Sequence, residues 1–182
     1  MTSLAPEGFR RRRKRQSMTV RKIEIERLTI TSSRSFETVV AALEAAIGRP
    51  DMAEFMKATR SATTYAELES VVQRSVSAAG LMLFMKLDAG AVMRSESGLA
   101  SPKAQRFLIG NPLIMKDMAK RVPEAASYAP VTVLVDERPD GVHLGYDKMA
   151  SFLAPYGNAE ALVVARELDA KIEKLMRDAA AG

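Results

Sequence analysis

The chain has 182 residues, 47% of them hydrophobic, which is enough for one domain with a substantial core and excludes disorder over the whole length. It has no cysteine, so disulfides, thiolate metal ligands, iron–sulfur clusters and cysteine nucleophiles are excluded. No apolar run approaches the roughly 20 residues of a membrane-spanning helix. Together with the lack of cysteine, this predicts a soluble, cytoplasmic protein without a transmembrane segment.

The net charge of +5 comes from one short segment near the N-terminus. Six of the 27 Lys and Arg residues are consecutive at 10–15, near the acidic Glu7, so the rest of the chain holds 21 basic and 21 acidic residues. We therefore expect residues 1–20 to be a disordered basic tail, and residues 21–182 to be one neutral α+β domain. Three interpretations of the tail are open: a solvated arm, a true translation start at Met18, or an arm for nucleic acid or an anionic membrane.

The first element is predicted from alternating apolar residues over 22–32, with a phase change near Arg27 that indicates a bulge or a strand beginning there. An apolar stripe at helical spacing follows and ends at Gly48, which predicts a helix.

Residues 49–63 predict a helical insertion within the domain. Asp51 and Glu54 have the spacing of a capping box, and apolar residues give the segment one face with which to pack. A further helix begins after Thr64 and is stopped by Gly80.

The middle of the chain predicts two strands and a short helix. Residues 81–87 are almost continuously apolar, and the polar stretch 94–103 is expected to be a loop. A short strand over 106–109 leads to Asn111, which stands where a helix N-cap is expected because a proline follows it.

The last third predicts a hairpin and a long helix. Residues 138–141, Arg-Pro-Asp-Gly, fit a type I turn between two alternating strands. The terminal helix carries Glu167 with Lys171 and Glu173 with Arg177, both at ion-pair spacing.

This order of elements predicts the fold class. Strands and helices do not alternate regularly, which disfavours a doubly wound parallel sheet. We expect an α+β fold: a mostly antiparallel five-stranded sheet with helices packed on one face, in β-α-β(4)-α order with a helical insertion.

Five different short motifs follow one another along the second half of the chain. They are Gly80-Leu81-Met82-Leu83-Phe84 leading to Asp88, Ile109-Gly110-Asn111-Pro112, Tyr128-Ala129-Pro130-Val131, Tyr146-Asp147, and Leu153 to Gly157. In this order and spacing, the sequence from Gly80 to Gly157 resembles a bacterial family known as domain of unknown function 302, and residues 28–48 look like the family's opening strand and helix. The resemblance implies a fold of the TATA-binding-protein kind and a homodimer, and it implies no activity.

Two positions depart from that family. Many members have a histidine after the aspartate that is Asp88 here, where this chain has Ala89, and many have another near the position of Tyr156. The resemblance therefore implies that chemistry based on those imidazoles is not carried over.

The strand-to-helix corner at Asn111 is the leading candidate for a ligand site. Free backbone N–H groups and a positive helix end favour an anion there, and Lys103, Arg106 and Lys116 lie near in sequence. The alternative is a plain helix cap and turn.

Two aspartates are the candidates for catalysis. Asp88 follows a buried strand, where a carboxyl group can have a raised pKa and act as a general acid, or can simply cap the next turn. Asp147 lies on the same strand face as His143, the only histidine, for which a surface or edge-strand position is the default interpretation. We expect no metal site and no cofactor.

Three functions therefore remain open. The first is a homodimeric domain that binds a small ligand, anionic if the corner at Asn111 is the site. The second is an enzyme that uses Asp88 or Asp147 as acid or base, with Lys or Arg as electrostatic stabilisers. The third is a nucleic-acid or membrane-surface adaptor that acts through residues 10–15.

Overall fold

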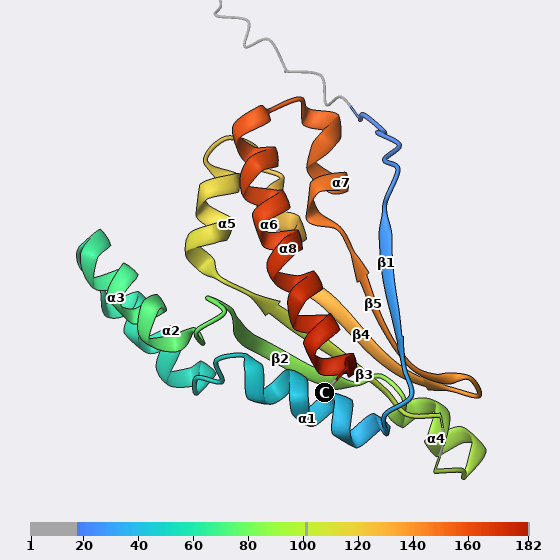
Figure 1. Cartoon of the computed structure of the whole chain (residues 1–182). Coiled ribbons are helices and arrows are strands. Elements are labelled where there is room, and N and C mark those ends of the chain that lie inside the picture. The colour runs from blue at the N-terminus through green and yellow to red at the C-terminus, as the bar shows by residue number, and fades with distance from the viewer. Residues whose placement is uncertain (1–17, 101, 182) are drawn as a thin grey trace, which may run out of the picture.

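The computed structural model describes residues 18–100 and 102–181, and its centre is one antiparallel sheet (Figure 1). The strand order is β1-β5-β4-β3-β2, with every neighbouring pair antiparallel. The strands are β1 (Arg27–Ser32), β2 (Met82–Asp88), β3 (Ala104–Gly110), β4 (Val131–Arg138) and β5 (Gly141–Asp147). The predicted fold class is confirmed. The basic segment 10–15 lies outside the described residues, and so do the interpretations that depend on it.

Eight α-helices accompany the sheet in this part of the chain. They are α1 (Phe36–Ala46), α2 (Met52–Ser61), α3 (Tyr65–Ser75), α4 (Ala91–Ser97), α5 (Pro112–Ala119), α6 (Ala125–Tyr128), α7 (Met149–Leu153) and α8 (Ala159–Ala181), with a 3-10 turn η1 (Ala154–Tyr156) after α7. Helix α8 crosses in front of the sheet in Figure 1, and α1 runs below it.

The core lies between the sheet and these helices. Because side chains alternate along a strand, every second residue of β4 and β5 faces α1 and α8. The fully buried members include Val133, Val135 and Leu144, which pack with Leu43 and Ile172. We call this side of the sheet the covered face and the opposite side the open face.

A buried carboxylate joins the end of β5 to α7 and α8. Asp169 of α8 accepts hydrogen bonds from the Tyr146 hydroxyl at 2.6 Å and from the backbone N–H groups of Met149 at 2.7 Å and Ala150 at 3.1 Å. It therefore satisfies N–H groups at the start of α7, which otherwise has no side-chain cap. Burial and the nearby Asp169 charge raise the pKa of Tyr146.

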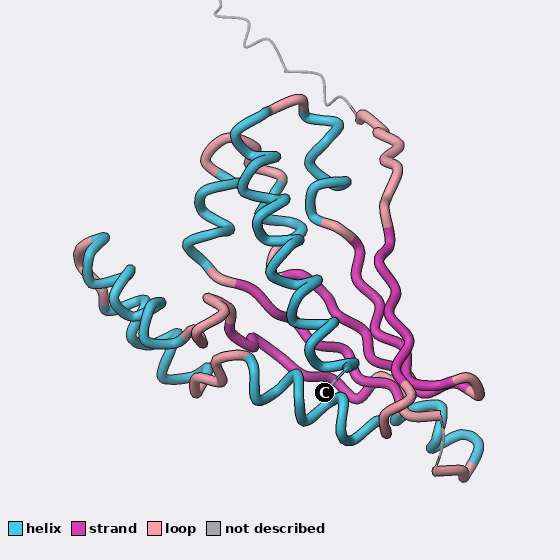
Figure 2. Tube along the Cα trace, viewed as in Figure 1, coloured by secondary structure: helices cyan, strands magenta, loops and turns pink. Residues whose placement is uncertain are grey.

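Helices α2 and α3 form a helical hairpin that projects from one edge of the sheet (Figures 1 and 2). Asp51 caps α2, and Thr64 with Glu67 forms the predicted capping box of α3. The pair contacts the body through a small cluster in which Phe55 and Val72 pack on Met82. The segment 49–63 that was expected to be helical thus contains α2.

Some local predictions differ from the structure. The stretch 94–103 was expected to be a loop, but α4 extends into it as far as Ser97 and ends at Gly98, whose φ of 68° suits glycine. Strand β3 is longer than predicted, because pairing with β2 and β4 on both sides extends it.

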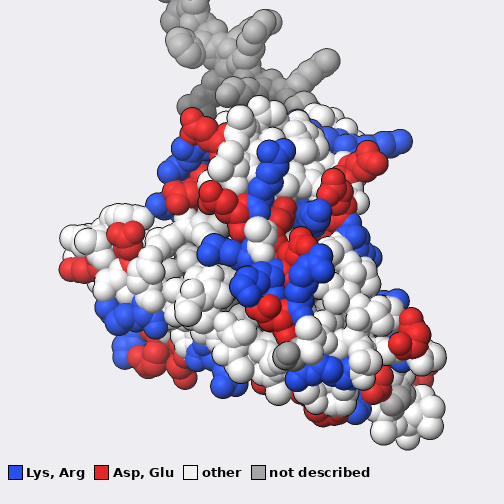
Figure 3. All heavy atoms as spheres, in the orientation of Figure 1, with Lys and Arg blue, Asp and Glu red and all other residues white. Residues whose placement is uncertain are grey.

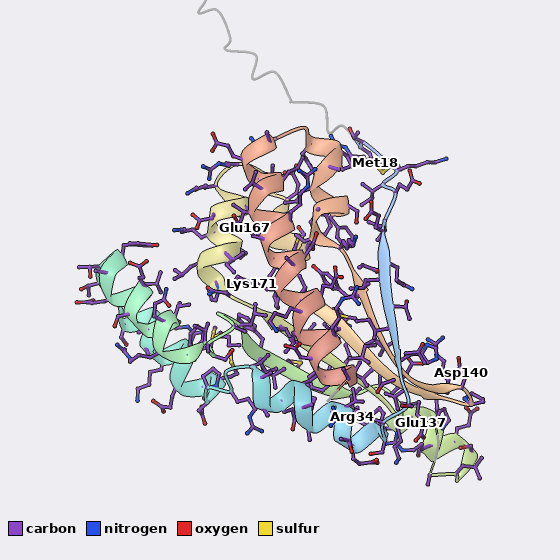
Figure 4. All side chains as sticks on the ribbon, in the orientation of Figure 1. Met18, Arg34, Glu137, Asp140, Glu167 and Lys171 are labelled. Carbon is purple, nitrogen blue, oxygen red and sulfur yellow. The ribbon has the colours of Figure 1, made fainter. Side chains whose placement is uncertain are left out.

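On α8, Glu173 and Arg177 form the expected pair at 2.6 Å. Lys171, labelled beside Glu167 in Figure 4, instead donates to the backbone carbonyl of Ala79 at 3.2 Å. Basic and acidic side chains are interspersed on the side of the molecule seen in Figure 3.

Candidate functional site on the open face of the sheet

A glycine lies in the middle of the open face. The strand register places Thr29, Gly145, Leu134 and Arg106 in one row across β1, β5, β4 and β3. A Cβ atom added to Gly145 would meet no atom within 4 Å, so the space above it is empty. Because glycine weakens a strand interior, such a position often marks a close approach by a ligand or another chain.

This empty space belongs to a cavity of about 430 Å³, which we call the open-face cavity. Four strands form its floor, and the chain around α6 and α7 forms one end wall through Tyr128 and Phe152. The Asp169 contacts described above hold the start of α7, and therefore support the part of that wall formed by Phe152. The volume suits a small organic molecule.

The three arginines that line the cavity differ in whether they have a carboxylate partner. Arg27 binds Asp147 through two hydrogen bonds, at 2.6 and 2.8 Å, and Arg138 is paired with Asp136. Arg106 donates to the Thr132 hydroxyl, with Nη2 at 3.1 Å, and has no carboxylate partner in the part of the chain that the structure describes. The cavity is therefore lined by one positive charge that no carboxylate of residues 18–100 and 102–181 neutralises.

The single histidine also lines this cavity. His143 lies on β5, the second strand from the sheet edge, and its side chain is only 10% exposed. The expectation of a surface or edge-strand histidine was therefore wrong. Its Nε2 contacts Asp140 at 2.9 Å across the hairpin turn (Asp140 is labelled in Figure 4), and its buried Nδ1 has no hydrogen-bond partner among the described residues. Since neither nitrogen is open to the cavity, His143 is poorly placed for proton transfer to a ligand.

The two aspartates that were considered as a catalytic acid or base are separated by the fold. Asp147 lines the open-face cavity, and the Arg27 guanidinium lowers its pKa. Asp88 lies at the end of the edge strand β2, 2.5 Å from Arg94, which lowers its pKa as well. A general acid needs the opposite shift, so both carboxylates are ionised at neutral pH and unsuited to donate a proton.

The four residues expected to bind a ligand at the Asn111 corner lie at separate places. Asn111 caps α5 as predicted, its Oδ1 accepting from Leu113 N at 2.8 Å and its Nδ2 donating to the Gly80 carbonyl at 2.9 Å. Both ends of the amide are thus occupied. The cavity beside it holds about 90 Å³.

The cations expected around that corner are dispersed. Lys116 is 2.8 Å from the Tyr65 hydroxyl of α3, and Lys103 pairs with Glu37 of α1. Lys103 lines a second cavity of about 420 Å³ together with Asp88. Of the four expected ligand-binding residues, Arg106 is the one that lines the open-face cavity.

Several residues of the cavity were missed by the sequence reasoning, above all Gly145, Thr132 and Phe152. One signal was present: Gly145 interrupts a strand whose neighbours Leu144 and Tyr146 are large and apolar. The others depend on the strand order, which no local pattern contains.

Other kinds of site find less support among the residues that the structure describes. No group of three or more carboxylate or imidazole side chains there is arranged to hold a metal ion. None of the helices there combines the length and the hydropathy needed to cross a membrane.

Comparison with known proteins adds the family and the fold. No curated protein matches the chain. A crystal structure described as an uncharacterized conserved protein DUF302 from Bacillus stearothermophilus matches with a TM-score of 0.58 and 10% sequence identity, over 84% of this chain and 97% of that one. At this identity the similarity shows the fold alone. Residues 56–179 match the family described as "Domain of unknown function DUF302". The chain therefore belongs to the DUF302 family.

Proposed function

We propose that this domain binds a small anionic molecule in the open-face cavity, and that it does so as a homodimer. The observation that carries the ligand proposal is the position of Arg106, a guanidinium that faces an empty space of about 430 Å³ without a carboxylate partner in the described residues. A guanidinium offers a planar fork of donors that matches a carboxylate, and the Thr132 hydroxyl beside it has a proton to donate.

The surrounding charges limit what the cavity accepts. Its lining contains Arg27, Arg106 and Arg138 against Asp136 and Asp147, which leaves an excess of one positive charge. A monoanion would neutralise this excess, whereas a group with two or more charges would leave an uncompensated negative charge in the cavity. Because Arg106 is solvent-exposed, we expect binding of moderate strength that weakens with added salt.

Titration calorimetry with acetate, benzoate and inorganic phosphate tests the ligand proposal. We expect a carboxylate to bind saturably, Arg106→Gln to weaken that binding about tenfold or more, and Gly145→Val to abolish it by filling the space above the strand. Lys116→Gln is the matched control, because Lys116 lies away from the cavity, and it should bind as the wild type does. Equal affinity in the wild type and Arg106→Gln would refute the proposal.

The homodimer proposal is supported by apolar side chains on the same open face. Met85 and Leu87 of the edge strand β2 are 49% and 42% exposed, and Leu108 of β3 continues this apolar surface beside Met85. A solvated face of an antiparallel sheet is ordinarily polar, so a second copy that covers this area would remove the unfavourable exposure.

Sedimentation velocity tests the dimer. We expect the wild type to sediment as a dimer at tens of micromolar, and Leu87→Glu to shift it to monomer. Val163→Glu on α8 is the matched control, because Val163 is an exposed apolar residue of another surface, at 52%. A wild type that sediments as a monomer would contradict the proposal.

A further inference from the structure

We infer that the anion bound in the open-face cavity is a small aryl carboxylate, in which a planar ring adjoins the carboxylate group. This inference rests on the proposed function and goes further, because it names the chemistry of both ends of the ligand. It depends on the aromatic end wall of the cavity.

The end wall consists of two stacked rings. Tyr128 and Phe152 lie with ring centroids 4.6 Å apart and ring planes inclined by 21°, and both line the cavity. Neither ring is fully buried, although each would be an effective core residue. Half-buried aromatic side chains at the edge of a cavity are well suited to stack against a planar ligand.

The helix that carries one of the two rings is held in place before any ligand binds. The Tyr128 hydroxyl lies 3.4 Å from the hydroxyl of Tyr156, and Phe152 belongs to α7, whose start is held by the buried Asp169. A ligand that stacks there would not have to order the wall itself, which lowers the free-energy cost of binding.

Chain spacing puts the two ends of the cavity roughly as far apart as a ring and its carboxylate. The guanidinium of Arg106 contacts Thr132, and Pro130, which lines the aromatic end, lies two residues earlier in the chain. Two residues of extended chain span about 7 Å, close to the length of a benzoate ion. A carboxylate bound to Arg106 and Thr132 would thus place an attached ring at the aromatic wall.

The floor of the cavity leaves room for the charged end of the ligand. Gly145 lies beside Leu134 in the row that carries Arg106, on the side of Thr132 away from Pro130, and the space where its Cβ atom would project is empty. The strand floor therefore does not block the approach of a carboxylate to the Arg106 guanidinium. The charge excess of one favours a monoanion, and thus a carboxylate over a phosphate ester.

Four probes separate the contributions of charge and ring. Benzoate has both, cyclohexanecarboxylate has the charge and a ring that is not planar, acetate has the charge alone, and benzamide has the ring alone. By titration calorimetry we expect benzoate to bind about three- to tenfold tighter than cyclohexanecarboxylate, and acetate and benzamide to bind more weakly still. Phe152→Leu should remove the preference for benzoate over cyclohexanecarboxylate, whereas Tyr128→Phe, which keeps the ring, should retain it.

A second measurement uses the wild type alone, in case Phe152→Leu does not fold. Benzoate should shift the ring-proton resonances of Phe152 upfield through its ring current, and cyclohexanecarboxylate should not. Equal affinities for benzoate and cyclohexanecarboxylate, both reduced by Arg106→Gln, would overturn the aryl inference and leave the proposed function intact. Carboxylate binding that does not respond to Arg106→Gln would overturn both.

Discussion

The two faces of the sheet use the same strands for different purposes, and β5 shows the contrast residue by residue. Leu144 and Tyr146 face the helices and are buried, at 0% and 2% exposure. Gly145 and Asp147 point the other way, where the first leaves an empty space and the second pairs with Arg27. Four consecutive residues thus alternate between a packed core and the floor of a cavity.

The contrast between the two faces shows which residues core packing dictates and which it leaves free. Residues of the covered face fill a continuous core that extends to α1 and α8, so their size and polarity are dictated by their neighbours. On the open face no neighbour requires a glycine at 145 or a guanidinium at 106. A strand interior that keeps a glycine and a cation facing a cavity is better explained by an external ligand than by folding.

The largest effect on stability is expected at Leu144 of the covered face, and its neighbour Gly145 on the open face serves as the comparison. Leu144→Ala should destabilise the protein by about 3 kcal/mol, because it leaves a cavity in a fully buried site. Gly145→Ala should change the stability by less than about 1 kcal/mol, since the new methyl group meets no atom and the backbone φ is not left-handed. Urea denaturation measures both. Comparable losses from the two variants would show that the open face is packed in solution.

A smaller loss of stability is expected when the hydroxyl group of Tyr146, the next residue on the covered face, is removed. Tyr146→Phe removes the donor at 2.6 Å from the buried Asp169 and should cost about 1.5 to 3 kcal/mol. Tyr156→Phe is the control, because its hydroxyl contact, at 3.4 Å to Tyr128, is long and partly exposed, and little change is expected. If both variants were equally stable in thermal unfolding, Asp169 would not be the anchor of α7 described above.

The smallest effect is the pH dependence of the open-face ion pair. Arg27 lowers the pKa of Asp147, so the pair stabilises the folded state above the unfolded pKa of about 3.9, and the contribution is lost as pH falls through the lower folded value. Arg27→Gln should therefore be slightly less stable than the wild type at pH 7, and the difference should vanish at low pH. A difference that grows on acidification would contradict this assignment.

Local patterns were sufficient to predict much of the fold. The Arg-Pro-Asp-Gly turn at 138–141, the asparagine cap of α5 and the capping box at Thr64 depend on residues close in sequence, and the structure shows all three. Helix α4 was missed because it is only seven residues long, buries none of them and has no apolar stripe at helical spacing. Asp88 contacts it through Arg94.

The candidate site could not be predicted in the same way. Thr29 and Arg106 are 77 positions apart in sequence and share a row only because β5 and β4 lie between β1 and β3. The cations near Asn111 in sequence point to different partners, since Lys116 meets Tyr65 of the α2–α3 hairpin and Lys103 meets Glu37. Proximity in sequence therefore pointed to Arg106, which lines the open-face cavity, but also to Lys103 and Lys116, which lie away from it.

The most direct test of the ligand proposal is a ¹H–¹⁵N NMR titration of the full chain with benzoate, following the backbone amide of Gly145 and the Nε–H of Arg106. We predict that both resonances shift and saturate with one dissociation constant, and that the shift at Gly145 is lost in Arg106→Gln. Shifts centred instead on Asn111, or none at either group, would contradict the assignment of the open-face cavity as the binding site.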